Sequence, residues 1–171
     1  MIGRTAHLRK QGFTLVELLI VVIILSILAA IVVPQFAGSA SDAKNAALDA
    51  NLSALRSATE LYYQQHSAYP SANASTANAA NSKEAFTDQL TLYSDATGKT
   101  ANAYNSATFK YGPYLKKGIP VEPISNSAAV EIVFAGTLGA VATGAATGGW
   151  KFDNKTGQLI ANSSDNNLDK R

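Results

Sequence analysis

The sequence predicts an α+β protein, in which one long N-terminal helix packs on a small antiparallel β-sheet head. Three observations support this fold class: an apolar run near the N-terminus, a helical amphipathic pattern directly after it, and alternating apolar residues near the C-terminus. The 171 residues are enough for one ordinary domain, so we expect a single head.

The apolar run is long enough to cross a membrane. Residues 18–33, LLIVVIILSILAAIVV, contain one polar side chain, Ser26, and Phe13 to Val16 extend the run backwards across a single acid, Glu17. From Phe13 to Val33 a helix spans roughly 31 Å, close to the hydrocarbon thickness of a bilayer. A buried core helix would normally have a polar face, and this segment has none. We therefore predict one transmembrane helix over residues 13–33.

The charges near this helix set its orientation. Arg4, Arg9 and Lys10 precede it without any acid, so the N-terminal leader should stay cytoplasmic while the C-terminal part crosses the membrane. Without these three, eleven basic and twelve acidic residues remain, a formal charge of −1. The rest of the chain has no basic stripe, so no nucleic-acid partner is expected.

The pattern beyond the span is amphipathic. Pro34 removes one helical hydrogen bond, so either a single helix continues to about His66, roughly 80 Å in all, or two helices meet at Pro34. Tyr69-Pro70 should end the helical segment, because the residue before a proline disfavours helical dihedrals. The apolar face after Pro34 is predicted to consist of Leu48, Leu52, Leu55 and Tyr62.

The head should begin with loops and one short helix. Residues 71–81 are small and polar and predict a loop. Ser82 is placed to cap a short helix that carries Phe86, Leu90 and Tyr93 on one side. Residues 95–106 are rich in turn formers, and two prolines in the connector 111–120 prevent long regular structure.

Strand signals come last. Residues 130–134 alternate in hydrophobicity, as do residues 150–153, and the turn residues 154–157 should return the chain as a hairpin through residues 158–161. The tract 136–149 is either a loop or a weakly specified strand. A small antiparallel sheet on the apolar helix face would bury both surfaces.

No constellation for chemistry is apparent, so we expect no catalytic site, no metal and no cofactor. The chain has no cysteine and two histidines, His7 and His66, and we interpret His66 as a solvated residue at the helix end. Asp165, Asn167 and Asp169 have the spacing that begins a calcium loop, but neither the glycine nor the closing glutamate follows. The triplets that start at Asn154 and Asn162 fit a glycosylation pattern that is common by chance.

Glu17 requires an explanation, because an ionised carboxylate without a partner costs on the order of a few kcal/mol in lipid. It lies one helical turn from Phe13, whose α-amino group would be a partner if the chain began there. The string 10–18, KQGFTLVEL, resembles the processing site of type IV prepilins, in which a basic leader ends in glycine and Phe-Thr-Leu-Val-Glu follows.

This resemblance implies a pilin-like fold and a defined maturation. A prepilin peptidase would cut between Gly12 and Phe13 and methylate the Phe13 amine, and Glu17 would neutralise that amine in a neighbouring subunit during assembly. The parts would be a leader over 1–12, the filament-core span over 13–33, an amphipathic helix over 34–70 and a periplasmic head over 71–171. The implied partners are further copies in a helical homopolymer, the peptidase, an inner-membrane platform, minor pseudopilins and membrane lipid.

The head resembles, more weakly, that of the major pseudopilins of type II secretion. The segments concerned are residues 51–70, the connector 111–116 and the hairpin 149–158, and the absence of cysteine differs from pilins with a disulfide-closed loop. We therefore expect an inner-membrane pseudopilus subunit that drives protein export. Two alternatives stay open: a type IV pilus subunit for motility, adhesion or DNA uptake, and a monomeric membrane-tethered binding module.

The N-terminus has two other interpretations. A secretory signal peptide would be cut after the apolar core, near the small residues 37–39, but the acid at the start of the core and the long helical pattern beyond it disagree. The second interpretation is a membrane anchor that is never processed.

Overall fold

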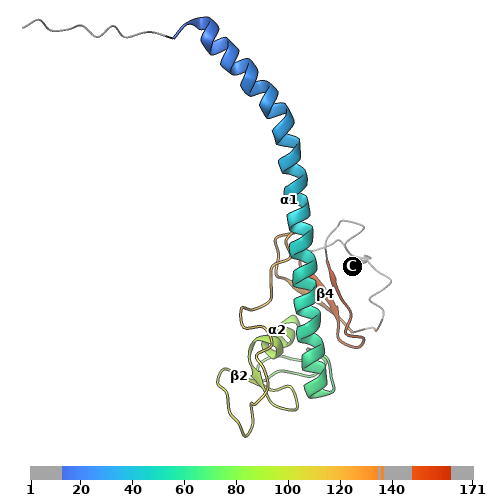
Figure 1. Cartoon of the computed structure of the whole chain (residues 1–171). Coiled ribbons are helices and arrows are strands. Elements are labelled where there is room, and N and C mark those ends of the chain that lie inside the picture. The colour runs from blue at the N-terminus through green and yellow to red at the C-terminus, as the bar shows by residue number, and fades with distance from the viewer. Residues whose placement is uncertain (1–12, 135, 137–147, 163–171) are drawn as a thin grey trace, which may run out of the picture. The chain divides into compact units, whose positions relative to one another are not determined.

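A computed structural model describes residues 13–134, 136 and 148–162, without the side chains of residues 34–37 (Figure 1). The chain divides into two compact units, Met1–Asp42 and Ala43–Arg171, and we describe each by itself. The secondary structure consists of helices α1 and α2 and strands β1 to β5, so the described part of the chain confirms the α+β class.

Helix α1 spans Leu15–His66, and the helical backbone includes Pro34. The alternative of two helices broken at that proline is therefore not what the structure shows. The first unit contains the apolar part of α1, which is long and apolar enough to cross a membrane, with a mean hydropathy of 3.2. Its large apolar side chains between Leu15 and Val33 are 43–82% exposed, so the described residues leave this apolar surface uncovered.

The second unit contains the amphipathic part of α1. The predicted face is correct, because Leu48, Leu52, Leu55 and Tyr62 are each at most 2% exposed. The helix ends at His66, and Ser67 follows in a left-handed conformation with φ 55°. The Ser67 amide donates to the Tyr63 carbonyl at 2.8 Å, which satisfies one carbonyl of the last turn.

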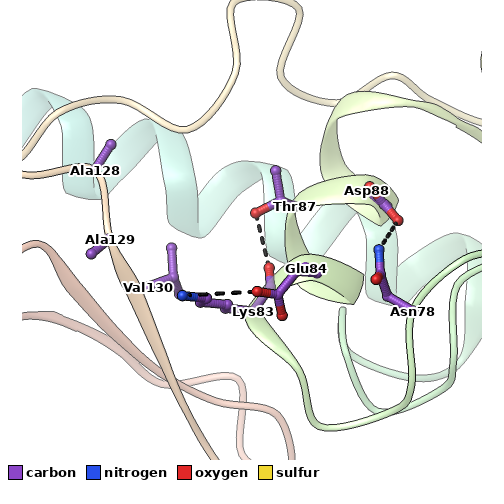
Figure 2. Close-up of a pocket in the computed structure, with 8 residues that line it drawn as sticks. All are labelled: Asn78, Lys83, Glu84, Thr87, Asp88, Ala128, Ala129 and Val130. Atoms are coloured by element: carbon purple, nitrogen blue, oxygen red, sulfur yellow. Dashed lines mark hydrogen bonds and ion pairs between the residues drawn. The ribbon is translucent and has the colours of Figure 1, made fainter.

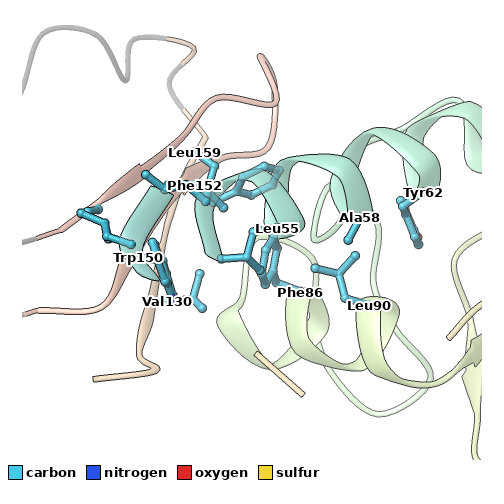
Figure 3. Packing of buried hydrophobic residues seen from close by; sticks show 12 residues of the cluster. Leu55, Ala58, Tyr62, Phe86, Leu90, Val130, Trp150, Phe152 and Leu159 are labelled. Atoms are coloured by element: carbon cyan, nitrogen blue, oxygen red, sulfur yellow. The ribbon is translucent and has the colours of Figure 1, made fainter. Parts of the chain in front are cut away.

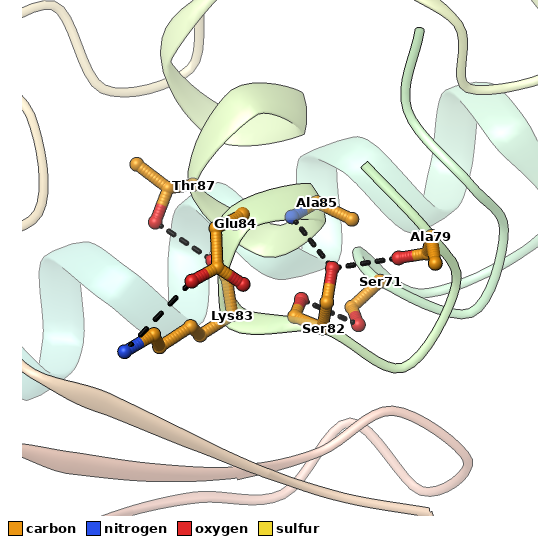
Figure 4. Close-up of polar contacts among 7 residues, drawn as sticks. All are labelled: Ser71, Ala79, Ser82, Lys83, Glu84, Ala85 and Thr87. Atoms are coloured by element: carbon orange, nitrogen blue, oxygen red, sulfur yellow. Dashed lines mark hydrogen bonds and ion pairs between the residues drawn. The ribbon is translucent and has the colours of Figure 1, made fainter. Parts of the chain in front are cut away.

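The short helix α2, Lys83–Thr91, begins where the sequence indicates. The Ser82 hydroxyl accepts a hydrogen bond from the Ala85 amide at 3.1 Å and donates to the Ala79 carbonyl at 2.6 Å (Figure 4). Ser82 is thus the N-cap, and its own carbonyl accepts from the Ser71 hydroxyl at 3.0 Å. The cap fixes α2 to the preceding loop.

The strands form two sheets. β1, Tyr93–Ser94, and β2, Thr100–Ala101, make a two-stranded antiparallel hairpin. The larger sheet has the order β3-β4-β5, with β3 at Val130–Val133, β4 at Trp150–Asp153 and β5 at Leu159–Ala161. β4 and β5 pair antiparallel, as the predicted hairpin requires.

The pairing of β3 with β4 differs from the antiparallel sheet that the sequence indicated. Val130 pairs with Trp150 and Val133 with Asp153, so the two strands run parallel and the larger sheet is mixed. The physical reason is the length of the connection, residues 134–149. A parallel pair needs a crossover of roughly a dozen residues or more, and this connection provides it.

The inner face of the β3-β4-β5 sheet packs on the helices, which confirms the predicted burial of both apolar surfaces (Figure 3). The ring centroids of Phe86 in α2 and Phe152 in β4 lie 4.8 Å apart. Trp150 is fully buried, and its indole N–H donates to the Pro120 carbonyl at 2.7 Å. The core therefore joins α1, α2 and the sheet. The buried indole N–H of Trp150 has a hydrogen-bond acceptor.

The structure shows the surroundings of His66 and Asn154, two residues that the sequence left exposed or unassigned. His66 is 8% exposed, so the description of a solvated helix end was wrong; packing of later segments over the end of α1 buries it. Asn154 is 4% exposed, and its amide donates to the Asn81 side chain at 2.8 Å, so it is a structural residue of the turn. The motif at Asp165, Asn167 and Asp169 lies outside the described residues.

Candidate processing and assembly site

The start of α1 is fixed by a reciprocal pair of side chains. One Glu17 carboxylate oxygen, Oε2, accepts hydrogen bonds from the Thr14 amide at 2.8 Å and from the Thr14 hydroxyl at 2.7 Å. In return, the Glu17 amide donates to the Thr14 hydroxyl oxygen at 3.2 Å. This Thr-x-x-Glu arrangement is a capping box, which satisfies amides that the first turn of a helix leaves unpaired.

The capping box gives Glu17 a partner within its own chain. A carboxylate in the first turn is also favoured by the positive end of the helix dipole. Thr14 contributes dipoles and no charge, however, so the carboxylate keeps its formal charge after capping. A cation from elsewhere would therefore still lower the free energy of this residue in lipid.

Phe13 lies just before the helix. It precedes the cap residue Thr14, and its side chain is 78% exposed. Gly12, the other residue of the expected cleavage site, lies outside the described residues. Phe13 lies two residues before Leu15, where α1 begins.

Ser26, the one polar residue of the run 18–33, forms a hydrogen bond within the helix. The Ser26 hydroxyl donates to the Val22 carbonyl at 2.7 Å, one turn earlier. A hydroxyl bonded in this way exposes no unpaired donor to hydrocarbon. The span is thus chemically suited to lipid from the capping box onwards.

The sequence analysis singled out Glu17 and missed Thr14. The pattern Thr14-x-x-Glu17 before an apolar run predicts a capping box from the sequence. In the sequence, Thr14 contributes only to the resemblance, because it carries no charge that would require an explanation in lipid. The structure brings Phe13, Thr14 and Glu17 together at the head of α1.

The described part of the head unit contains one shallow recess of moderate size beside α2. A recess of about 300 Å³ lies beside the N-terminal part of α2 and the start of β3 (Figure 2). Lys83 and Glu84 on its rim form an ion pair of 3.8 Å, and the Asp88 carboxylate accepts from Asn78 at 2.7 Å. Among the residues that the structure describes, no group of three His, Asp or Glu side chains could hold a metal ion.

Comparison with known proteins supports the reading of the N-terminus. Residues 7–33 match the family described as the prokaryotic N-terminal methylation motif. This match covers the end of the basic leader, with Arg9 and Lys10, the capping box and the apolar part of α1. The N-terminal part of the chain is therefore similar to the N-terminal methylation segment of that family.

Individual relatives are similar to part of this chain. Type II secretion system core protein G of Pseudomonas aeruginosa is 41% identical over 63 residues, which are 37% of this chain and 44% of the relative. The protein of the same name from Klebsiella pneumoniae is 39% identical over 62 residues, 36% of this chain and 44% of the relative. The type IV narrow pilus major component PilA5 of Thermus thermophilus is 41% identical over 71 residues, 42% of this chain and 61% of the relative.

The similarity is limited in extent. The matched part of this chain spans less than two thirds of the length of each of these relatives. No solved structure matches the chain at a significant level.

Proposed function

We propose that this chain is the precursor of a structural subunit of a type II secretion pseudopilus. One observation carries the proposal: a capped apolar helix starts immediately after a basic leader, inside a matched N-terminal methylation motif. The relatives carry the names of secretion and pilus components, which supports a structural role.

The precursor would insert with residues 1–12 in the cytoplasm and the head in the periplasm. A prepilin peptidase would cut the bond between Gly12 and Phe13 and methylate the new amine of Phe13. The mature subunit would then remain in the inner membrane through residues 13–33. Its amphipathic continuation, residues 34–70, and its head, residues 71–171, would lie on the periplasmic side.

Assembly would move the apolar part of α1 from lipid into a filament of identical subunits. In such a filament the Phe13 amine of one copy can meet the Glu17 carboxylate of another, where a charge-assisted hydrogen bond is stronger than in water. Contacts between copies that do not close into a ring produce a helical polymer. An inner-membrane platform and minor pseudopilins are the proposed partners of this step.

The mass of the mature protein tests the processing step. The purified protein should begin at N-methylated Phe13, and replacement Gly12→Leu should leave a full-length membrane precursor. Gly12→Ala is the matched control, because one added methyl group is the smallest possible change. A mature N-terminus near Ala40, or an intact leader in the wild type, would refute the proposal.

A type IV pilus subunit is the second candidate. The observation in its favour is the match to PilA5, which covers a larger share of the relative than the core protein G matches do. Deletion of the gene distinguishes the pseudopilus subunit from the pilus subunit. Loss of exported proteins from the medium with normal surface pili supports the pseudopilus, and loss of surface pili with normal export supports the pilus.

A further inference from the structure

The end of α1 carries a buried histidine to which no role has been assigned. His66 lies where three segments of the head meet: the last turn of α1, strand β1 and the connector that contains Tyr111 and Tyr114. The Tyr62 ring stacks on the imidazole, with centroids 3.9 Å apart and planes within 5° of each other. The Tyr111 and Tyr114 rings make T-shaped contacts with the imidazole, with centroids 5.2 and 6.2 Å from its own.

The hydrogen bonds of His66 define one form of the ring. Nδ1 lies 2.9 Å from the Tyr62 carbonyl, which can only accept, so Nδ1 carries a proton. Nε2 lies 3.1 Å from the Ser94 hydroxyl, which can donate to it. The neutral ring protonated at Nδ1 is therefore satisfied on both sides.

Ser94 connects this ring to two other segments. It belongs to β1, is fully buried, and exchanges two backbone hydrogen bonds with Tyr111, of 3.0 and 3.1 Å. The hydrogen bond between Ser94 and His66 thus links the hairpin and the connector to the end of α1. The chain places these three segments far apart in sequence, and His66 is in contact with all of them.

Protonation of Nε2 would change this arrangement. Nε2 would become a donor, so the Ser94 hydroxyl could no longer donate to it, and a charge would be buried. Burial lowers the pKa of His66 below its usual value of 6.5, and this effect outweighs the opposing influence of the hydrogen bonds to the Tyr62 and Asp95 backbone and of the Asp95 carboxylate.

Apart from Asp95, the titratable groups named here around the ring supply no negative charge. Burial raises the pKa of Tyr62, and burial raises the pKa of Tyr114 to about 12, so both phenols stay neutral. Lys110 lies over the Tyr111 ring, with Nζ 5.1 Å from its centroid, and a cation there disfavours a second one. Asp95 is the acid that faces the site, and its carboxylate already accepts from the Thr97 and Lys99 amides.

We propose that His66 is a pH-sensitive latch, whose neutral imidazole holds β1 and the connector on the end of α1 and whose protonation releases them. The direction follows from linkage. A base with a lowered pKa in the folded state stabilises the latched form above pH 6.5, and that stability is lost as the pH falls through the pKa of the folded state. This inference does not depend on the proposed function.

Nuclear magnetic resonance of the full chain in detergent, with His7→Gln, tests the latch, because His66 is then the single histidine. We expect the Nδ1–H tautomer at neutral pH and a titration midpoint below 6.5. Hydrogen-exchange protection of the Ser94 and Tyr111 amides should fall by up to about tenfold per pH unit across that titration. The Trp150 amide, which donates to the Ala129 carbonyl in the sheet, is the internal reference and should keep its protection.

The variant His66→Gln is the matched control, since it retains a donor and an acceptor and does not titrate. Its Ser94 and Tyr111 protection should not change over the same pH range. A midpoint at or above 6.5, an equal fall in His66→Gln, or a fall shared by Trp150 would overturn the latch. If His66→Gln does not fold, three measurements on the parent chain still test the latch. They are the tautomer of His66, its titration midpoint and the protection of the Trp150 amide.

Discussion

At the scale of single residues, the N-terminus of α1 depends on Thr14. Its hydroxyl and amide both donate to Glu17, so Thr14 holds the carboxylate at the head of the helix. In the filament, the same carboxylate is proposed to meet the amine of another copy. Thr14 would then be a positioning residue for assembly.

Replacement Thr14→Ala should loosen the first turn of α1. The loss of an N-cap hydroxyl costs about 1 kcal/mol of helix stability, so the Leu18 amide, which donates to the Thr14 carbonyl at 3.3 Å, should exchange faster. Hydrogen exchange in detergent micelles measures this. Thr14→Ser is the control because it keeps the hydroxyl, and equal exchange in both variants would show that the cap has no role.

Gly157 is a second residue whose environment decides its identity. It follows the turn between β4 and β5 with φ +74°, and a Cβ placed on it would overlap the ring of Tyr69. An alanine there would meet both a strained backbone and a steric clash. The close approach of Tyr69 thus selects glycine.

Gly157→Ala should lower the free energy of unfolding by about 1–3 kcal/mol, from backbone strain and overpacking together. Gly118→Ala is the control: its φ is +82° but no atom lies within 4 Å of the added Cβ, so only the backbone strain applies. Thermal or urea denaturation compares the two variants. Equal losses would mean that the contact with Tyr69 contributes nothing.

At the scale of elements, α2 is short and depends on its cap. Nine residues are too few for a stable isolated helix, so α2 relies on Ser82 and on the burial of Phe86 and Leu90. The loop before it is held by the Ser71 hydroxyl on the Ser82 carbonyl. Loss of the cap should therefore destabilise both the loop and the helix.

Ser82→Ala should destabilise the head by about 1 kcal/mol, because the Ala85 amide loses its partner. Thr87→Ala in the same helix is the control. The Thr87 hydroxyl only donates back to the Lys83 carbonyl on an exposed face, so this change should stay within about 0.5 kcal/mol. Denaturant midpoints of the two variants provide the measurement, and a larger loss for Thr87→Ala would contradict the cap.

At the scale of the whole molecule, the residue proposed to act in assembly and the core of the head belong to different units. Glu17 belongs to the first unit, and the core residue Leu55 belongs to the second. A change in one unit should therefore affect one property and leave the other unchanged. This separation distinguishes an assembly residue from a folding residue.

Glu17→Val should still be cleaved and membrane-inserted, with a head of normal stability, yet fail to join filaments, because the amine of a neighbour would lose its partner. Leu55→Ala is the opposite control and should cost the head about 2–5 kcal/mol. Shear fractions and cross-linking measure filaments, and thermal unfolding measures the head. Normal filament yield from a cleaved Glu17→Val protein would refute the pairing.

The sequence by itself determined the features that depend on local pattern. The span, the apolar face that includes Leu55, the cap at Ser82 and the β4-β5 hairpin all follow from spacing, capping or turn residues within a few positions of one another. The N-terminal site was recognisable for the same reason, since its residues lie within one turn of helix. Only Thr14 was overlooked, although its signal was present.

The tertiary structure alone decided what depends on distant segments. The parallel pairing of β3 with β4 is set by a crossover, and no local pattern distinguishes it from a hairpin. His66 is buried because β1 and the connector cover it, and the side chain of Gln89 is fully buried because its amide bonds the Ser71 amide and the Asn73 and Gly98 carbonyls. Periodicity reports which face of an element is apolar, whereas burial of a polar side chain requires partners that only folding brings together.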